Sequence, residues 1–281
     1  MVTGTSTGIG RSCALLLDRL GFHVFAGVRE ERDGRALIEE ASDRLTPVVL
    51  DVGDGDSVGA AAGAVMEALP SDAGIRGLVN NAGITVTGPL EFLPPEELRR
   101  VLDINVVGQL AVTQAFLPLL RRGRGRIVNM GSFNGRVAAP FIGPYCASKF
   151  ALEGLNDALR LELAPWDVGV SLIEPGSIDT GIWRKYEAYT DWLAGILPKE
   201  AQGLYGQALG AAREAAKRRA ASGAPPEVGA GAVARALTSK RPKTRYLVGW
   251  DARLGAALAK LVPDRALDEA IVRYMRLPRN P

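Results

Sequence analysis

The sequence predicts an α/β protein with a doubly wound parallel β-sheet and helices on both faces of the sheet. Short apolar runs of strand length alternate with helical patterns through the first two-thirds of the chain. These runs are hydrophobic almost throughout, as expected of strands buried on both faces of a parallel sheet. The alternation predicts βαβ units with right-handed crossovers.

The predicted strands follow one another along the chain. They comprise residues 24–28, 47–50, 78–79, 126–130, 168–173 and 245–248. The predicted helices comprise residues 9–20, 31–42, 56–69, 95–120, 144–164 and 227–239, with two short helices split by Pro263 within 252–275. The first strand is represented only by Met1, Val2 and Thr3, whereas a strand usually has about five residues. We therefore expect the natural chain to begin several residues earlier.

We expect one domain in three parts, because neither an internal repeat nor a flexible linker interrupts the pattern. Residues 1–181 form the core, 182–224 an inserted helical lid, and 225–281 the C-terminal helices with the last strand. An α/β domain of this size, 281 residues, often folds as one unit.

Composition argues against several classes of protein. Hydrophobic residues make up 47% and charged residues 23%, as in ordinary globular domains. The net charge of +3 is small and evenly spread, so we expect no nucleic-acid partner. We also expect no membrane span, no signal peptide and no metal site. Cys13 and Cys146 lie in different predicted helices and form no disulfide framework, which favours the cytoplasm.

A glycine-rich turn joins the first strand to the first helix. It reads Thr3-Gly4-Thr5-Ser6-Thr7-Gly8-Ile9-Gly10. Glycines permit a tight turn and a close approach of backbone to a pyrophosphate, and the helix start at Ile9 directs N–H groups at the anion. The turn predicts a Rossmann-type dinucleotide site.

The end of the second strand indicates which dinucleotide binds. NAD-preferring folds place an acidic residue there, which hydrogen-bonds the ribose hydroxyls. In this chain that position is Val28, and Arg29 follows it. The planar guanidinium of an arginine suits bidentate contact with a 2′-phosphate. We therefore favour NADP(H) over NAD(H), the alternative being that Arg29 is a surface residue opening a loop.

Tyr145 and Lys149 are four residues apart, so on a helix they share one face. Lowering the pKa of a tyrosine by about 3 units requires roughly 4 kcal/mol. A cation about 4–5 Å away, at an effective dielectric near 20, supplies about 3–4 kcal/mol. We therefore expect Lys149 to lower the pKa of Tyr145 and make it a proton donor and acceptor. The alternative is an ordinary exposed pair on a helix.

Further motifs in the same order resemble the short-chain dehydrogenase/reductase family. Besides the glycine turn and the Tyr145–Lys149 pair, they are Asp51-Val52, Asn80-Asn81-Ala82-Gly83, Asn105, Ser132, and Pro175-Gly176 with Ile178 and Thr180. The resemblance covers residues 1 to about 181. Residues 22–29 and the length of the C-terminal part look like the hydroxysteroid and retinol dehydrogenase branch.

The resemblance implies an oxidoreductase that interconverts an alcohol and a ketone or aldehyde by hydride transfer. Tyr145 would be the general acid and base, Ser132 would polarise the carbonyl, and Asn105 would hold a water that links Lys149 to solvent. The expected cofactor contacts are Gly4, Thr5, Ser6, Thr7, Gly8, Ile9, Gly10, Arg29, Asp51, Val52, Asn81, Ala82, Gly83, Tyr145, Lys149, Pro175, Gly176, Ile178 and Thr180.

Apolar and aromatic residues around the expected site favour a hydrophobic substrate, such as a steroid, retinoid or aromatic ketone. The expected substrate contacts are Ser132, Phe133, Asn134, Phe141, Tyr145, Trp183 and Tyr186. The alternative is that the aromatic residues of the lid only dock it onto the core.

Family members commonly pair through helices equivalent to 95–120 and 144–164, which implies a homodimer or homotetramer. Three alternative functions remain open. They are a catalytically silent NADP-sensing protein of the same fold, a 3-oxoacyl thioester reductase, and another Rossmann-type enzyme such as an epimerase or methyltransferase.

Overall fold

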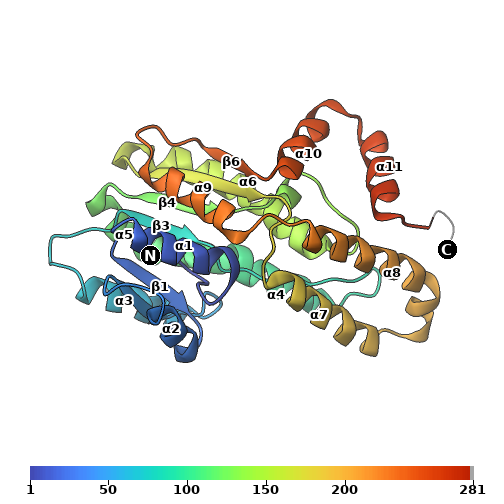
Figure 1. Cartoon of the computed structure of the whole chain (residues 1–281), viewed down its shortest axis with the longest axis horizontal. Coiled ribbons are helices and arrows are strands. Elements are labelled where there is room, and N and C mark those ends of the chain that lie inside the picture. Colours follow the sequence, from blue (N-terminus) through green and yellow to red (C-terminus); the bar gives the residue numbers. More distant parts are fainter. Residues whose placement is uncertain (279–281) are drawn as a thin grey trace.

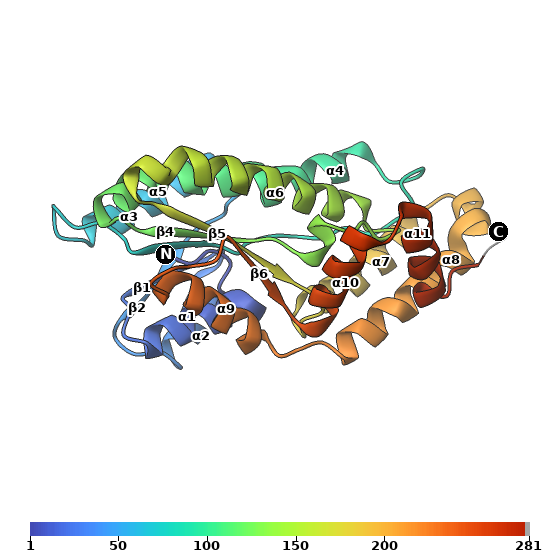
Figure 2. The same ribbon diagram turned by 90° about the horizontal axis from the view of Figure 1, so that it is seen from above.

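A computed structural model describes residues 1–278, apart from the side chains of residues 182–186 and 194. It has three layers, with a parallel sheet between two layers of helices (Figures 1 and 2). The predicted doubly wound α/β class is confirmed.

The strands pair in parallel throughout the described sheet. They are β1 (Val24–Val28), β2 (Leu45–Val49), β3 (Gly77–Asn80), β4 (Arg126–Met130), β5 (Gly169–Pro175) and β6 (Arg245–Val248). β1 pairs with β2, while β3, β4, β5 and β6 pair in that order.

The short first strand joins these two groups. Val2 forms parallel bridges with Ala26 of β1 and with Val79 of β3. The N–H of Val79 donates to the Met1 carbonyl at 2.9 Å, and the Met1 ammonium donates to the Gly77 carbonyl at 2.9 Å. Burial lowers the pKa of that ammonium to about 5. The glycine-rich turn therefore leaves from the middle of the sheet.

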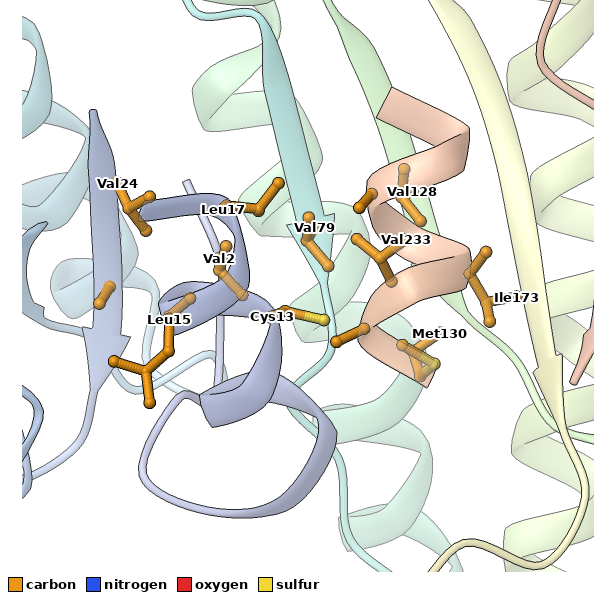
Figure 3. Close-up of a cluster of buried hydrophobic side chains, with 14 of the residues drawn as sticks. Val2, Cys13, Leu15, Leu17, Val24, Val79, Val128, Met130, Ile173 and Val233 are labelled. Atoms are coloured by element: carbon orange, nitrogen blue, oxygen red, sulfur yellow. The ribbon is translucent and has the colours of Figure 1, made fainter. Parts of the chain in front are cut away.

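Helices cover both faces of the sheet (Figure 2). On one face lie α1 (Gly8–Arg19), α2 (Glu31–Ile38) and α9 (Pro226–Thr238), and on the other α3 (Gly55–Glu67), α5 (Gly108–Gly123) and α6 (Gly143–Leu163). In Figure 3, Cys13 of α1 and Val233 of α9 meet Val2, Val79 and Val128 of the sheet. This buried apolar cluster fixes the start of α1 relative to the strands.

The remaining helices gather beyond the carboxyl ends of the strands (Figures 1 and 2). They are α4 (Pro95–Leu102), α7 (Ile182–Ile196), α8 (Lys199–Ala221), α10 (Trp250–Leu261) and α11 (Asp264–Met275). Val86, Leu93 and Val101 of the core form a buried cluster with Leu193 and Leu197 of the lid. Residues 182–224, which the sequence predicts to be a lid, thus contain two helices, α7 and α8, at this end of the sheet.

The helix predicted at 95–120 is divided by a π-helical turn, Asp103–Val107, between α4 and α5. By length and composition alone, the stretch Pro95–Gly123 is long and apolar enough to cross a membrane, which the sequence did not lead us to expect. In the fold, the side chains of Val112, Phe116 and Leu120 from this stretch are buried against the sheet.

The largest change of a predicted boundary is at α2, which ends at Ile38 although the pattern predicts a helix to residue 42. The Ser42 N–H donates to the Asp18 carboxylate at 2.9 Å. This hydrogen bond to α1 takes Ser42 out of the helix.

Candidate active site

The glycine turn is held in a shape that only small residues allow. Gly4 has φ +67°, and a Cβ added to it would lie 2.9 Å from the Cα of Ala82. A Cβ added to Gly10 would meet the Gly4 carbonyl oxygen and the Asn81 amide. Within the described residues, no side chain caps the first turn of α1. The backbone N–H groups of that turn therefore point out of the N-terminal end of the helix without a capping side chain. Such an end attracts an anion.

The segment after β3 supports this turn through hydrogen bonds. The Thr3 hydroxyl accepts from the N–H groups of Asn81 and Ala82 at 2.9 and 3.0 Å. The Asn81 side chain donates to the carbonyls of Thr3 and Gly4 at 3.0 Å. Asn81 and Ala82 thus position the turn, a role that the sequence did not distinguish from direct contact with the cofactor.

The side chains of the glycine turn differ in their burial and in their contacts. The Thr5 hydroxyl is buried and donates to the Gly27 carbonyl of β1 at 3.0 Å, so it holds the turn against the sheet. Ser6 is half-buried and Thr7 is exposed. The side chain of Ile9 packs against the apolar cluster under α1.

The residues predicted at the adenosine end lie at the ends of β1 and β2. Arg29 is exposed directly after β1, whereas Val28 is buried. Asp51 is exposed and its carboxylate accepts from the Gly53 N–H at 2.9 Å. Asp51, Gly53 and Ile104 line a hollow of about 400 Å³. Val52 is buried beside them.

Ser132, Tyr145 and Lys149 come together at the ends of β4 and α6. The Ser132 side chain lies close to the Tyr145 hydroxyl. The Lys149 ammonium lies 5.5 Å from the centroid of the Tyr145 ring and donates to the Met130 carbonyl at 2.7 Å. The Ser132 hydroxyl also accepts from the Asn134 N–H at 3.1 Å. The predicted set therefore forms one cluster.

The charges in this cluster differ from the sequence prediction. Burial raises the pKa of Tyr145, and the hydrogen bond with Ser132 and the charge of Arg219 offset this only in part. Burial also lowers the pKa of Lys149 to about 8. A lysine that is buried and directed at the Met130 carbonyl is a weak source of stabilisation for a phenolate, so the expected lowering of the Tyr145 pKa by Lys149 is not what this geometry gives.

Asn105 lies in the π-helical turn, a feature often found at functional sites. Its side-chain amide donates to the Ile84 carbonyl at 2.9 Å and to the Ser148 hydroxyl at 3.0 Å. Its side-chain oxygen accepts from the Ile84 N–H at 2.8 Å. A Cβ added to Gly83 would lie 3.1 Å from that oxygen. Asn105 therefore supports α6 between Tyr145 and Lys149.

The loop after β5 faces the glycine turn. The Gly176 N–H donates to the Val248 carbonyl at 2.9 Å, and the Ser177 N–H donates to the Asp251 carboxylate at 2.7 Å. Thr180 lies against Gly8, and both line a cavity of about 480 Å³. Ile178 is buried below the loop.

Asp251 is a functional candidate that sequence reasoning missed. It lies in the first turn of α10, far along the chain from Gly176, and it fixes the backbone of the loop after β5. The only local signal is the Gly249 turn before the helix, which has φ +98°.

Two aromatic residues close in the chain to Ser132 and Tyr145 contact the helices α8 and α10. A Cβ added to Gly255 of α10 would lie 2.5 Å from the Phe133 ring, so α10 packs on that ring. Phe141 makes an edge contact with Tyr205 of α8, with ring centroids 6.3 Å apart. Tyr205 is a second residue that the sequence did not single out. The predicted contacts Trp183 and Tyr186 lie outside the described side chains.

The sequence predicts that the protein has no metal site. Across residues 1–278, apart from the side chains not described, no group of three or more His, Cys, Asp or Glu lies together in a way that could hold a metal ion.

Known proteins are similar to this chain over nearly its whole length. The family model described as short chain dehydrogenase matches residues 1–190. The chain is 39% identical to retinol dehydrogenase 5 of Mus musculus over 285 residues, covering 99% of this chain and 88% of that protein. It is 36% identical to human 17-beta-hydroxysteroid dehydrogenase type 6, with the same 99% and 88% coverage.

Two solved structures share the fold with different cofactors. A short chain dehydrogenase/reductase from Burkholderia phymatum in complex with NAD has a TM-score of 0.78 and 27% identity, covering 100% of this chain and 95% of its own. A short chain dehydrogenase from Burkholderia cenocepacia in complex with NADP has a TM-score of 0.70 and 27% identity, covering 99% and 96%.

Proposed function

Since the chain belongs to the short-chain dehydrogenase/reductase family, in the branch of retinol and hydroxysteroid dehydrogenases, and is an alcohol–carbonyl oxidoreductase, we propose that it uses NADP(H) and Tyr145 as its acid and base. One observation carries the proposal: the Ser132 side chain lies close to the Tyr145 hydroxyl, and Lys149 lies on the same helix face as Tyr145. Two neighbouring hydroxyl groups can both donate hydrogen bonds to the carbonyl oxygen of a substrate. That oxygen gains negative charge during reduction and then accepts a proton.

The residues of the cleft fit a nicotinamide dinucleotide. The uncapped first turn of α1 suits a pyrophosphate, and the close packing of Gly4 against Ala82 and of Gly10 against Asn81 holds the turn in a compact shape. Thr180 lines a hollow together with Thr7 and Gly8 of this turn, and Asp51 lines a separate hollow. When bound, the nicotinamide supplies or accepts the hydride.

The side chains of the cluster then have distinct tasks. In reduction, Ser132 donates a hydrogen bond to the substrate carbonyl oxygen and orients it. Tyr145 donates the second hydrogen bond and then its proton. Lys149 would hold the ribose hydroxyls of the nicotinamide dinucleotide. Asn105 keeps α6 in place and supports reprotonation through water. Oxidation runs these proton transfers in reverse.

The test is an NADPH-oxidation assay across ketosteroids, retinal, aromatic ketones and 3-oxoacyl thioesters. Tyr145→Phe is expected to bind NADPH as the wild type does and to lose turnover by about 10²- to 10⁴-fold. Activity close to wild type in that variant would contradict the mechanism. NADPH binding without turnover on any substrate would favour the silent sensor instead.

The preference for NADP(H) rests on the end of β1. Val28 is buried and presents no carboxylate, and the exposed Arg29 follows it. A guanidinium here suits a 2′-phosphate. Arg29→Asp is expected to lower the ratio of kcat/KM for NADPH over NADH at least about tenfold, and Arg29→Lys to keep most of it. An unchanged ratio in Arg29→Asp would refute the assignment.

A hydrophobic substrate is supported by the aromatic side chains near the cluster. Phe141 and Tyr205 meet in an edge contact, and Phe133 directly follows Ser132. The relatives named as retinol and hydroxysteroid dehydrogenases point to the same class of substrate. The assay above is expected to favour retinal or ketosteroids over 3-oxoacyl thioesters.

A homodimer or homotetramer is supported by the outer face of α6. Phe150 and Leu161 on α6 are 46% and 66% exposed, and Trp166 just beyond it is 48% exposed. These residues form an apolar surface that suits a second copy of the chain. Leu161→Glu is expected to lower the molecular mass in light scattering, and a monomeric wild type would refute the assembly.

A cytoplasmic location is supported by the state of the cysteines. Cys13 and Cys146 are both free and buried. Burial raises the pKa of Cys13 to about 12, which keeps it an unreactive thiol. Fractionation of cells that express the chain is expected to recover it in the cytosol, and recovery in the membrane fraction would contradict this.

A further inference from the structure

A series of linked ion pairs begins at the short turn that carries Ser132. Arg136 ends this turn, and its guanidinium binds the Glu174 carboxylate with two hydrogen bonds of 2.6 and 2.8 Å. The side chain of Glu174 is 0% exposed. Glu174 lies in β5 directly before Pro175, where the loop that faces the glycine turn begins.

Arg245, the first residue of β6, links these ion pairs to helix α6. Its guanidinium lies 2.9 Å from Glu153 and 2.7 Å from Asp157 of α6, and 3.4 Å from the Glu174 carboxylate. Glu153 and Asp157 follow Lys149 by one and two helical turns. The ion pairs therefore join the Ser132 turn, the end of β5, the start of β6 and α6.

The turn that carries Ser132 also lies close against α6. A Cβ added to Gly135 would lie 2.8 Å from the Lys149 carbonyl oxygen and 3.4 Å from a Glu153 carboxylate oxygen. The placement of Ser132 against Tyr145 thus depends on how this turn sits on the helix. Arg136 anchors the far end of the turn.

A buried ion pair adds little net stability, because the loss of hydration offsets the attraction between the charges. Its two parallel hydrogen bonds instead fix direction, since a guanidinium and a carboxylate meet in one plane. The pair with Glu174 also raises the pKa of Arg136, so the cation persists.

We propose that Arg136 is a positioning residue, whose two-point contact with Glu174 fixes the Ser132 hydroxyl against the Tyr145 hydroxyl. Arg136 acts through Ser132 and touches neither substrate nor cofactor. The inference rests on the oxidoreductase function proposed above.

The main experiment separates positioning from stability. Arg136→Met leaves the Glu174 carboxylate buried with only Arg245 nearby, so both Tm and kcat are expected to fall. The double variant Arg136→Met/Glu174→Gln has no unpaired buried charge, so its Tm is expected to return to the wild-type value. Its kcat is expected to stay at least about tenfold low, with the NADPH Kd unchanged. Wild-type kcat in the double variant, or in Arg136→Met alone, would overturn the proposal.

A second variant decides the matter if the double variant does not fold. Arg136→Lys keeps the positive charge and loses the two-point contact. It is expected to keep the wild-type Tm and to lower kcat about tenfold. The matched control is Arg273→Lys, from an exposed pair with Glu269, which is expected to change neither quantity. Wild-type kcat in Arg136→Lys would overturn the proposal.

A readout without substrate keeps this inference separate from the proposed function. The NMR signal of isotope-labelled Tyr145, assigned by its loss in Tyr145→Phe, reports the hydrogen bond with Ser132. It is expected to shift in Arg136→Lys and not in Arg273→Lys. If the wild type turns over no carbonyl substrate, the proposed function fails while this shift still supports positioning; an unchanged signal in Arg136→Lys would overturn positioning by itself.

Discussion

Glycines on the cofactor side of the cleft and glycines in the lid meet opposite surroundings. A Cβ added to Gly4 would lie 2.9 Å from the backbone of Ala82, and one added to Gly10 would meet main-chain and amide atoms. In α8, an added Cβ at Gly206 or Gly210 would have no neighbour within 4 Å among the described residues. The same residue type is required by close packing in one region and is unconstrained in the other.

This difference shows which region is shaped by main-chain contacts and which by side-chain contacts. On the cofactor side, main-chain groups and short polar side chains determine the shape, as in the contacts of Thr3 with Asn81 and Ala82. On the lid side, side-chain contacts such as Phe141 with Tyr205, and Thr87 with Thr190 at 3.0 Å, join the helices to the core. We therefore expect substitutions on the cofactor side to have the larger effects.

After Tyr145, the largest expected effect is at Ser132. Ser132→Ala removes one of the two hydroxyl donors to the substrate carbonyl, so kcat is expected to fall by about 10²- to 10³-fold. The NADPH Kd is expected to stay unchanged in a fluorescence titration. Ser71→Ala, on an exposed loop, is the control. A kcat for Ser132→Ala within a few-fold of the wild type would remove Ser132 from the catalytic set.

The glycine turn comes next. Gly10→Ala places a methyl group against the Gly4 carbonyl, so the turn must shift and the NADPH Kd is expected to rise by about tenfold to a hundredfold. The matched control is Gly59→Ala in α3, where the added Cβ meets open space. Equal NADPH affinity in both variants would mean that the turn does not shape the cofactor site.

Lys149→Met is expected to abolish most activity and yet stabilise the fold. Burial lowers the Lys149 pKa from 10.5 to about 8, so below pH 8 the folded protein holds a disfavoured charge. Removing it is expected to raise the free energy of unfolding by about 1–2 kcal/mol at pH 7, since the loss of the Met130 hydrogen bond offsets part of the gain.

The pH dependence of that stability supplies the check. Between about pH 8 and 10.5 the unfolded chain keeps the lysine proton that the folded protein has lost, so the wild type gains stability as pH rises. The advantage of Lys149→Met is therefore expected to shrink across this range in denaturant titrations. An advantage that grows with pH would contradict the burial argument.

The smallest expected effect is in the lid. Gly206→Ala and Gly210→Ala lie within α8 and meet open space, so each is expected to stabilise the helix by about 0.5–1 kcal/mol. Thermal unfolding measures the gain. A loss of stability in either variant would show that α8 is closely packed at these positions.

Several parts of the fold and site could be predicted because their signals are local. The apolar runs at β1, β4 and β6 gave their bounds directly, since strands of a parallel sheet are near-continuous hydrophobic runs. The spacing of Tyr145 and Lys149 placed both side chains on one face of α6. The π-helical turn at Asn105 left no such signal, because its shape comes from the contacts of Asn105 with Ile84 and Ser148.

The sequence by itself determined the order of strands and helices along the chain and the glycine turn, because each depends on neighbours close in the chain. Only the tertiary structure decided that Arg136 binds Glu174, that Asp251 holds the loop after β5, and that burial raises the Tyr145 pKa. These three features join segments far apart in sequence, or depend on how much water the fold excludes. Ion pairing and dehydration are set by the distances between such segments, which no local pattern encodes.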